Sequence, residues 1–322
     1  MRVGLYFDLR DPRPGGIGWA AVHGRALELA EHADARGIDA LWVTEHHFFD
    51  DGYLPQPLVF AAALAARTRR ARIGTAVLIA PLRDAVTIAE EAAVVDVISG
   101  GRLELGLGAG YRVPEFRAFG ADPGERFPLL EDRAREVRRL WAEGPVTPTP
   151  AQEEVPIWIG AHGPRGARLA GRVGAGLLTL DPRLLEPYAE ALAAAGGRRE
   201  DARMAGPLAW ILCDDPERTW AAVRPHAERN WAAYDRYARE GREPDGGPTL
   251  PRVFDKVDGG RRPPVKALTV DDAVARLRAL AEQAPVEHVF LWERVAGMPE
   301  EIAQRHVELV CSELLPRVRE LP

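Results

Sequence analysis

Cysteine is almost absent from this sequence of 322 residues, in which Cys213 and Cys311 are the only two. They lie far apart and fit neither a metal-binding spacing nor a disulfide framework. Zinc held by cysteines and a disulfide-stapled secreted fold are therefore excluded, and a reducing compartment is expected.

Long hydrophobic runs are also missing. No apolar stretch approaches the roughly 20 residues that a membrane-spanning helix needs. Residues 1–8 lead straight into a strand-like pattern, so the N-terminus lacks the charged and apolar regions of a signal peptide. We therefore expect a cytoplasmic protein without a membrane partner.

No cluster of basic residues occurs either. The 42 Lys and Arg are scattered among 48 Asp and Glu, which gives a formal net charge of −6 and a pI near 5.8. This distribution argues against nucleic acid or an anionic membrane surface as a partner. Because 46% of the residues are hydrophobic, the chain can bury a full core. These properties favour small-molecule chemistry.

Strand-like apolar runs alternate with helical patterns along the whole chain. Eight such runs occur, at residues 3–8, 40–44, 72–79, 103–108, 155–161, 176–180, 208–213 and 287–292. This alternation implies parallel strands joined by helical crossovers, and eight such units close most simply into a barrel. The sequence therefore predicts an α/β fold, with residues 1–322 forming a single (β/α)₈ TIM barrel with insertions.

Two segments interrupt the alternation. Residues 48–55 form a polar and aromatic loop, and residues 240–268 are rich in proline and glycine and too long for a plain connection. We expect the second segment to be an insertion between strands seven and eight. Both segments follow the carboxyl ends of strands, where barrel enzymes carry their active sites. The insertion is expected to cover the site; a plain surface loop or a subunit contact is the alternative.

A glycine-rich turn follows the fifth predicted strand. In residues 156–166, Pro-Ile-Trp-Ile-Gly-Ala-His-Gly-Pro-Arg-Gly, an apolar strand runs into a turn where a helix begins. Glycines let backbone N–H groups approach a ligand, and Pro164 suits the first helical turn. The helix N-terminus attracts anions. The pattern predicts a site for a phosphorylated cofactor, although an ordinary strand-to-helix turn would look similar.

A second glycine cluster, Gly106-Leu107-Gly108-Ala109-Gly110, ends the fourth predicted strand. It lacks the third glycine and the acidic residue of a dinucleotide-binding fingerprint, so a Rossmann domain is disfavoured. Glycines at a strand end still allow a flat ring or a phosphate chain to lie against the backbone.

Two adjacent histidines follow the second predicted strand, in Thr44-Glu45-His46-His47. Because neighbouring strand residues point to opposite faces, at most one histidine faces the barrel mouth, where it can transfer protons near neutral pH. A histidine that merely caps the strand is the structural alternative. A metallohydrolase site is disfavoured, because adjacent side chains diverge and no further ligands recur at later strand ends. We predict no metal.

Four segments taken together resemble one protein family. They are residues 38–48 (IDALWVTEHHF), 73–78 (IGTAVL), 99–106 (SGGRLELG) and 115–120 (EFRAFG). In this order they resemble the bacterial luciferase-like flavin-dependent oxidoreductases, over nearly the whole first two-thirds of the chain. The resemblance implies a (β/α)₈ barrel with insertions, a homodimer, and reduced FMN or coenzyme F-420 bound at the carboxyl-terminal mouth.

The resemblance also implies roles for individual residues. His46 is implied to lie beside the cofactor ring as the catalytic residue, and Ala76-Val77 to form a non-prolyl cis peptide behind that ring. The residues implied to bind the cofactor are Tyr6, Ala76, Val77, Gly108, Ala109, Gly110, Tyr111, Gly160, Ala161, His162, Gly163, Pro164, Arg165 and Gly166.

Departures within the family bear on the cofactor. Flavin-using luciferases carry an arginine for the phosphate where this chain has Ala109, which places coenzyme F-420 ahead of FMN. Glu45-His46-His47 is the feature that instead resembles the flavin-using luciferases. A glutamate serves as general acid in some deazaflavin sugar dehydrogenases where this chain has Tyr111, which argues against that substrate class.

The cofactor decides the chemistry, because a deazaflavin transfers hydride whereas a flavin can also activate O₂. We expect hydride transfer to or from a small organic substrate. An FMN-dependent monooxygenase is the alternative, followed by a non-catalytic flavin-binding subunit. The pocket aromatics suggest an apolar or planar ligand; they are Phe48, Phe49, Tyr53, Trp210 and Trp292.

Overall fold

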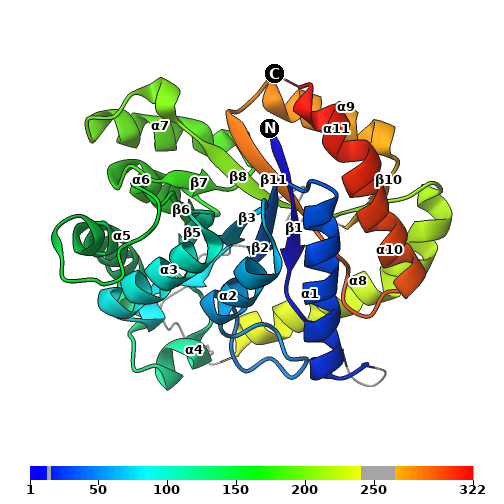
Figure 1. Cartoon of the computed structure of the whole chain (residues 1–322), viewed down its shortest axis with the longest axis horizontal. Helices are drawn as coiled ribbons and strands as arrows, with labels where there is room; N and C mark the ends of the chain where they lie inside the picture. The colour runs from blue at the N-terminus through cyan, green and yellow to red at the C-terminus, as the bar shows by residue number, and fades with distance from the viewer. Residues whose placement is uncertain (13–15, 241–264, 322) are drawn as a thin grey trace.

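A closed parallel barrel forms the centre of the molecule (Figure 1). The computed structural model describes residues 1–12, 16–240 and 265–321. The strands are β1 (Arg2–Phe7), β2 (Ala40–Val43), β3 (Arg72–Thr75), β4 (Leu78–Ile79), β5 (Leu103–Gly108), β6 (Ile157–Gly160), β7 (Gly176–Leu178), β8 (Met204–Leu208), β9 (Trp210–Leu212), β10 (Lys266–Leu268) and β11 (Val286–Trp292). The order β3-β2-β1-β11-β8-β7-β6-β5 is closed by pairing of β3 with β5, so the predicted (β/α)₈ barrel is confirmed.

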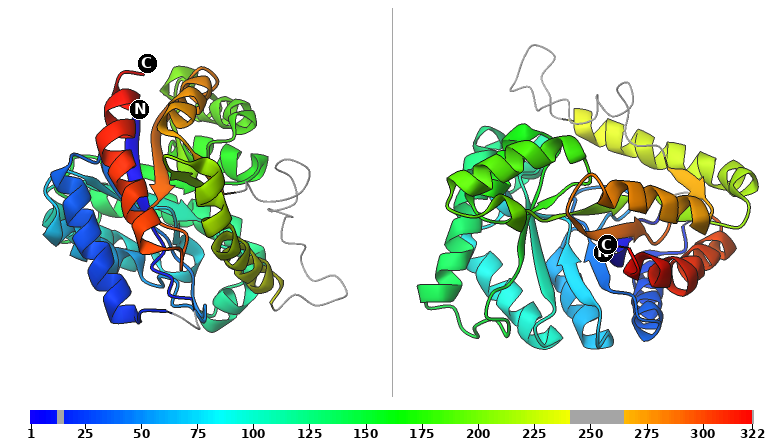
Figure 2. Two further views of the ribbon diagram at one scale, coloured as in Figure 1. Left: turned by 90° about the vertical axis from the view of Figure 1, so that its right-hand side faces the viewer. Right: turned by 90° about the horizontal axis from the view of Figure 1, so that it is seen from above.

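Helices surround the barrel, as the view from above in Figure 2 shows. They are α1 (Trp19–Ala35), α2 (Pro57–Arg67), α3 (Ala85–Ser99), α4 (Val113–Ala118), α5 (Arg126–Glu143), α6 (Pro164–Arg172), α7 (Leu185–Ala194), α8 (Pro216–Arg239), α9 (Val270–Ala281), α10 (Glu300–Leu309) and α11 (Leu315–Arg319). Short 3₁₀ turns lie at Ala80–Leu82, Pro123–Glu125, Pro182–Leu184 and Arg199–Asp201, and a π-helical turn at Val310–Leu314. None of the described helices is long and apolar enough to cross a membrane.

Local sequence signals place these helices. Asp84 caps α3 by accepting a hydrogen bond from the Thr87 N–H, and Gly100 ends that helix with φ at +70°. In α6, Leu169 and Ala170 belong to the buried stripe, whereas Arg165 and Arg168 are exposed. The helices therefore pack one apolar side on the barrel.

The seventh barrel strand differs from the prediction. It is β8, not residues 208–213; β9 leaves the barrel and pairs with β10 in a separate two-stranded sheet. Gly206 and Pro207 resemble a turn signal in the sequence, yet they lie within β8. Gly206 is required there because a Cβ would stand 2.9 Å from the Leu180 Cγ. Close packing, rather than a turn, explains this glycine.

The predicted insertion at residues 240–268 is only partly described. Residues 241–264 lie outside the described residues, so its expected role as a cover has no structural counterpart here. Lys266–Leu268 form β10, and before the gap α8 lies at the carboxyl end of β1 (Figure 1).

Aromatic side chains fill the barrel interior. Trp42 and Trp158 are fully buried, and Trp42 stacks on Phe290 with ring centroids 4.7 Å apart. Gly74 makes room for the Trp42 side chain, because a Cβ there would lie 2.2 Å from the Trp42 ring. The Trp158 Nε1–H donates to buried Glu104 at 2.6 Å. The barrel interior is therefore a packed core rather than a channel.

Candidate active site

Ala76 and Val77 form an apolar ledge at the carboxyl-terminal mouth. Their peptide bond is cis, as the resemblance implies, and it separates β3 from β4. Both residues are half-buried, so the ledge remains accessible. The Tyr6 hydroxyl donates a hydrogen bond to the Ala76 carbonyl oxygen. Burial raises the pKa of Tyr6 well above its usual value, which keeps this donor protonated.

The predicted glycines at the ends of β5 and β6 both contact the Val77 side chain. A Cβ on Gly108 would lie 2.2 Å from the Val77 Cγ2, and one on Gly160 would lie 2.6 Å from the Val77 Cγ1. Any larger residue would displace Val77. The room that these glycines leave is thus filled by Val77, which itself presents the surface that faces the mouth.

The loop after β5 turns back against β4. Gly110 has φ at +66°, and a Cβ there would lie 2.7 Å from the Ile79 Cγ2. The turn leaves Ala109 and Tyr111 half-buried at the rim of the mouth. Tyr111 thereby reaches the loop that follows β2.

His46 lies in this rim with both ring nitrogens engaged. Its Nδ1 is 2.9 Å from the Glu115 Oε1, and its Nε2 is 3.1 Å from the Tyr111 hydroxyl. A carboxylate only accepts, so Nδ1 carries the proton and Nε2 accepts from Tyr111. The ring stacks on Phe49 with centroids 4.9 Å apart and is 8% exposed. The Nε2 lone pair of His46 is therefore directed at the Tyr111 hydroxyl.

His47 has a different partner. Its Nε2 lies 2.8 Å from the Glu45 Oε1, which also accepts from Arg83 at 2.6 Å. The other Glu45 oxygen accepts the backbone N–H of Ile79 at 2.6 Å. Glu45 and His47 therefore anchor β4, while His46 lies against Tyr111. In residues 1–12, 16–240 and 265–321, no group of three or more His, Cys, Asp or Glu could hold a metal ion.

Glu115 and Arg112 belong to this site, but sequence reasoning assigned them no role. Glu115 is fully buried and also accepts the backbone N–H of His47 at 2.9 Å. Arg112 donates to the His47 carbonyl oxygen and to Glu240, and its guanidinium lies 4.7 Å from the Tyr237 ring. In the sequence, a glutamate in the first turn of a short helix looks like an ordinary surface residue. Only the family resemblance of the whole EFRAFG segment pointed to Glu115.

The turn between β6 and α6 carries the predicted anion-binding features. Pro164 begins α6, and a Cβ on Gly163 would meet nothing within 4 Å, so its backbone is accessible. Arg165 lies 4.3 Å and Arg126 5.0 Å from the Phe127 ring. Burial and the neighbouring Arg165 lower the pKa of Arg126. Neither arginine has a carboxylate partner among the described residues, so an anion here would relieve their repulsion.

The other predicted residues of this turn differ in exposure. Ala161 is buried and fills the space beside Gly166, where a Cβ would lie 2.7 Å from the Ala161 Cβ. His162 is exposed. Both therefore occupy the turn that precedes α6, one as packing and one at its surface.

A small cavity of about 30 Å³ lies under α8, at the carboxyl ends of β1 and β11. Asp8 and Trp292 line it, and Trp292 packs on Tyr6 with ring centroids 4.4 Å apart. Burial raises the pKa of Asp8 to about 6, opposed by nearby Arg10. We term this space the inner cavity.

The predicted pocket aromatics separate in the structure. Phe49 and Tyr53 pack against His46, and Trp292 lines the inner cavity. Phe48 is 60% exposed, and Trp210 lies in β9, outside the barrel. Phe48 has φ at +61°, in the left-handed region, and its ring lies 5.8 Å from the His47 ring.

Comparisons with known proteins agree with this architecture. Residues 4–310 match the family model for luciferase-like monooxygenases. The crystal structure of monooxygenase RslO1 from Streptomyces bottropensis superimposes with a TM-score of 0.78 and 26% identity, covering 98% of this chain and 99% of that one.

The curated relatives differ in cofactor. The F420-dependent glucose-6-phosphate dehydrogenase of Amycolatopsis mediterranei is 27% identical over 327 residues, which cover 92% of this chain and 94% of the relative. The oxygenase component of the flavin-dependent trigonelline monooxygenase of Acinetobacter baylyi is 30% identical over 169 residues, or 48% of this chain and 47% of the relative.

Proposed function

The chain belongs to the luciferase-like monooxygenase family, and we propose that it is an oxidoreductase that uses coenzyme F-420 for hydride transfer to or from a small organic substrate. The observation that carries this proposal is the pairing of an accessible Ala76–Val77 ledge with a buried, carboxylate-oriented His46 in the loop that follows the adjacent strand, β2. When bound, a deazaflavin supplies hydride chemistry and a flavin additionally supplies chemistry with O₂.

The residues fit a flat ring with an anionic tail. The ledge offers an apolar surface for the ring, and the start of α6 with Arg165 and Arg126 offers charge for the tail. Gly160 contacts Val77, and Arg165 follows five residues later, in the first turn of α6. The two residues are therefore at most about 17 Å apart along the chain. One segment thus connects the ring surface to the anion surface, which supports binding across both.

His46 is the residue proposed to move a proton. Its Nε2 accepts from the Tyr111 hydroxyl, while Glu115 holds the proton on Nδ1. When Nε2 takes a proton during the reaction, the imidazolium faces the Glu115 carboxylate, which stabilises its charge. Glu115 acts through His46 and is a positioning residue.

An FMN-dependent monooxygenase is the second candidate function. The adjacent pair His46 and His47, each oriented by its own glutamate, favours it. Against it stands Ala109, which supplies no charge for a phosphate at the end of β5.

Fluorescence-quenching titrations with coenzyme F-420 and FMN test the cofactor. We expect F-420 to bind with micromolar affinity or better and FMN more weakly. Arg165→Gln should weaken F-420 binding about 10-fold, as expected for loss of one charge-assisted hydrogen bond. Arg168→Gln, an exposed position on the same helix, is the control. Tighter FMN binding reverses the choice of cofactor, and binding of neither cofactor removes the oxidoreductase assignment.

We also propose a homodimer. Helices α2 and α3 pack together and leave several aliphatic side chains exposed, among them Val59 at 68% and Ile98 at 46%. Neighbouring exposed aliphatics of this kind mark an association surface. Light scattering should give twice the chain mass, and Ile98→Glu should shift it towards a monomer; an unchanged dimer would place the contact elsewhere.

A further inference from the structure

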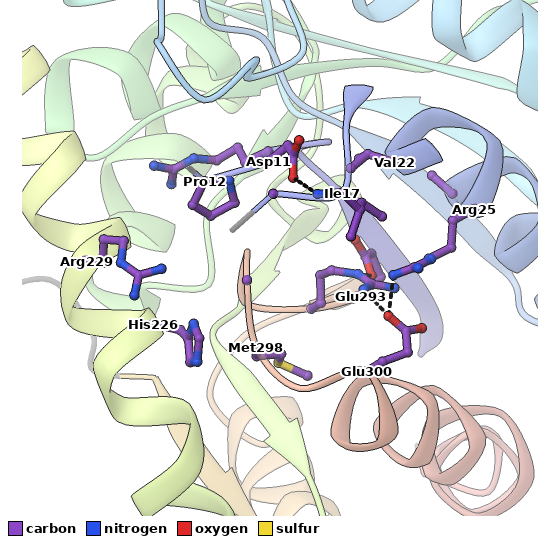
Figure 3. Close-up of a pocket in the computed structure, with 15 residues that line it drawn as sticks. Asp11, Pro12, Ile17, Val22, Arg25, His226, Arg229, Glu293, Met298 and Glu300 are labelled. Carbon is purple, nitrogen blue, oxygen red and sulfur yellow. Dashed lines mark hydrogen bonds and ion pairs between the residues drawn. The ribbon is translucent and has the colours of Figure 1, made fainter. Parts of the chain in front are cut away.

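A second, larger cavity of about 440 Å³ adjoins the inner cavity (Figure 3). Its walls come from the segment after β1 together with α1, from α8, and from the segment after β11 together with the start of α10. Figure 3 shows His226 and Arg229 of α8 facing Asp11 and Pro12 on one side and Met298 on the other. We term this space the outer cavity.

Several nitrogen atoms on its wall are without partners. Arg10 is 4% exposed; its Nε and Nη2 bind Asp51 at 2.7 and 2.6 Å, but its buried Nη1 has no partner. The buried Nδ1 of His226 has none either. Arg229 makes no ion pair within the part of the chain that the structure describes. Buried polar atoms without partners are costly, and the arginine donors among them point to a ligand that accepts hydrogen bonds.

The carboxylates of the same wall are already engaged. Glu300 binds Arg25 at 2.5 Å and Arg294 at 2.8 Å. Glu293 binds Arg294 at 2.6 Å, and Asp11 accepts the backbone N–H groups of Ile17 and Gly18 at 2.9 Å. Among the described residues, the cationic groups left for a ligand are therefore Arg229 and one arm of Arg10, which select an anion, and the His226 ring lies beside them.

The remaining wall is apolar. Ile17, Val22 and Met298 line it, so the ligand carries a hydrocarbon or ring body as well as a charge. Arg10 and Arg294 line the inner cavity as well as the outer one. The two cavities therefore adjoin at these two arginines.

We propose that the outer cavity binds the anionic group, a carboxylate or a phosphate, of a small organic substrate whose body extends towards the inner cavity. Naming the ligand a substrate rests on the proposed function; binding of the anion does not. Gly297 supports the assignment, because a Cβ there would lie 3.2 Å from the His226 Nδ1 and would crowd the proposed anion.

Benzoate and its uncharged isostere benzamide test the site in the full chain without cofactor. Nitrogen-15 spectra of histidine, with His226 assigned from His226→Gln, report binding at that ring. We expect benzoate to saturate the His226 shift with a Kd of about 1 mM or tighter. It should also raise the pKa of His226, which burial and Arg229 now lower. Benzamide should leave the ring unchanged.

Variants on one helix provide the matched control. Arg229→Gln should weaken benzoate binding about 10-fold. Arg224→Gln, an exposed position that pairs with Glu228 on α8, should leave it unchanged. Phenyl phosphate distinguishes the two anionic groups, since tighter binding than benzoate identifies a phosphate and weaker binding a carboxylate.

Three results would overturn the site: benzamide binding equal to benzoate, saturation without a change at His226, or equal losses in the two arginine variants. Cofactor titration of the same wild-type protein is a separate measurement. Its failure refutes the proposed function, whereas failure of benzoate to move His226 refutes this inference alone.

Discussion

Replacement of Glu115 by glutamine tests whether a buried carboxylate sets the activity of His46. The carboxylate accepts from the His46 Nδ1 and from the His47 N–H, both at 2.9 Å, and lies 3.9 Å from the Arg112 Nη1. Glutamine keeps the size but removes the charge. It leaves the neighbouring Arg112 guanidinium with less compensation, which further disfavours a positive charge on His46.

The expected magnitude follows from the lost interaction. A hydrogen bond to a charged group stabilises by about 1.5–3 kcal/mol. We expect the full interaction to be made only when His46 is protonated on both nitrogens. In that case its loss slows the reaction roughly 10- to 100-fold. Affinity for the cofactor should change no more than a few-fold, because Glu115 is fully buried behind His46.

Single-turnover oxidation or reduction of the bound cofactor measures the rate, and fluorescence quenching measures the affinity. Glu115→Asp should recover part of the rate, since it restores the charge at a longer distance. Glu136→Gln, at the exposed Arg139 pair on α5, controls for loss of a carboxylate as such. A rate within about 3-fold of wild type, or a loss seen only as weaker cofactor binding, would refute the positioning role of Glu115.

Three further outcomes are expected. His46→Ala should lower kcat roughly 10²–10⁴-fold with cofactor affinity nearly unchanged, while His47→Ala does far less; equal losses in kcat would assign both to structure. Gly108→Ala should weaken cofactor binding by about 1–3 kcal/mol through displacement of Val77, and adding Val77→Ala should restore it, as titration of both variants will show. Burial lowers the pKa of His306 to about 4, below the ordinary 6.5, so the neutral ring stabilises the fold above pH 6.5 and this contribution is lost as the pH falls towards 4. Urea unfolding of wild type and His306→Phe should then show their stability difference shrinking by about 3 kcal/mol between pH 7 and pH 4.

The barrel was predictable because its strands are buried and therefore read as apolar runs at regular intervals. The failure at β8 has a physical cause: Gly206 serves close packing against Leu180, and Pro207 sits beside it, so a strand interior imitates a turn. The sequence shows that a glycine is present, but not whether a turn or the close packing of a neighbouring side chain requires it.

The candidate site was predictable only where one short segment carries it. His46 and His47 are adjacent in sequence, so local geometry was enough to predict that they point apart, although both lie in the loop after β2. Glu115 lies 69 residues from His46, and no local pattern announces that pairing. The outer cavity is harder still, because its walls come from three segments that are far apart in the sequence.

The role of Gly108 and Gly160 changes how the cofactor surface should be understood. In the sequence they suggest a backbone open to a ligand, but in the structure Val77 fills the space that they leave. The two glycines therefore set the position of Val77, and Val77 sets the shape that a ring would meet. Specificity at this surface then depends on one aliphatic side chain held by two glycines and, through Ala76, by the Tyr6 hydroxyl. Gly108 ends β5, Gly160 ends β6 and Val77 lies between β3 and β4, so a small substitution at either glycine acts on the ligand through Val77 rather than directly.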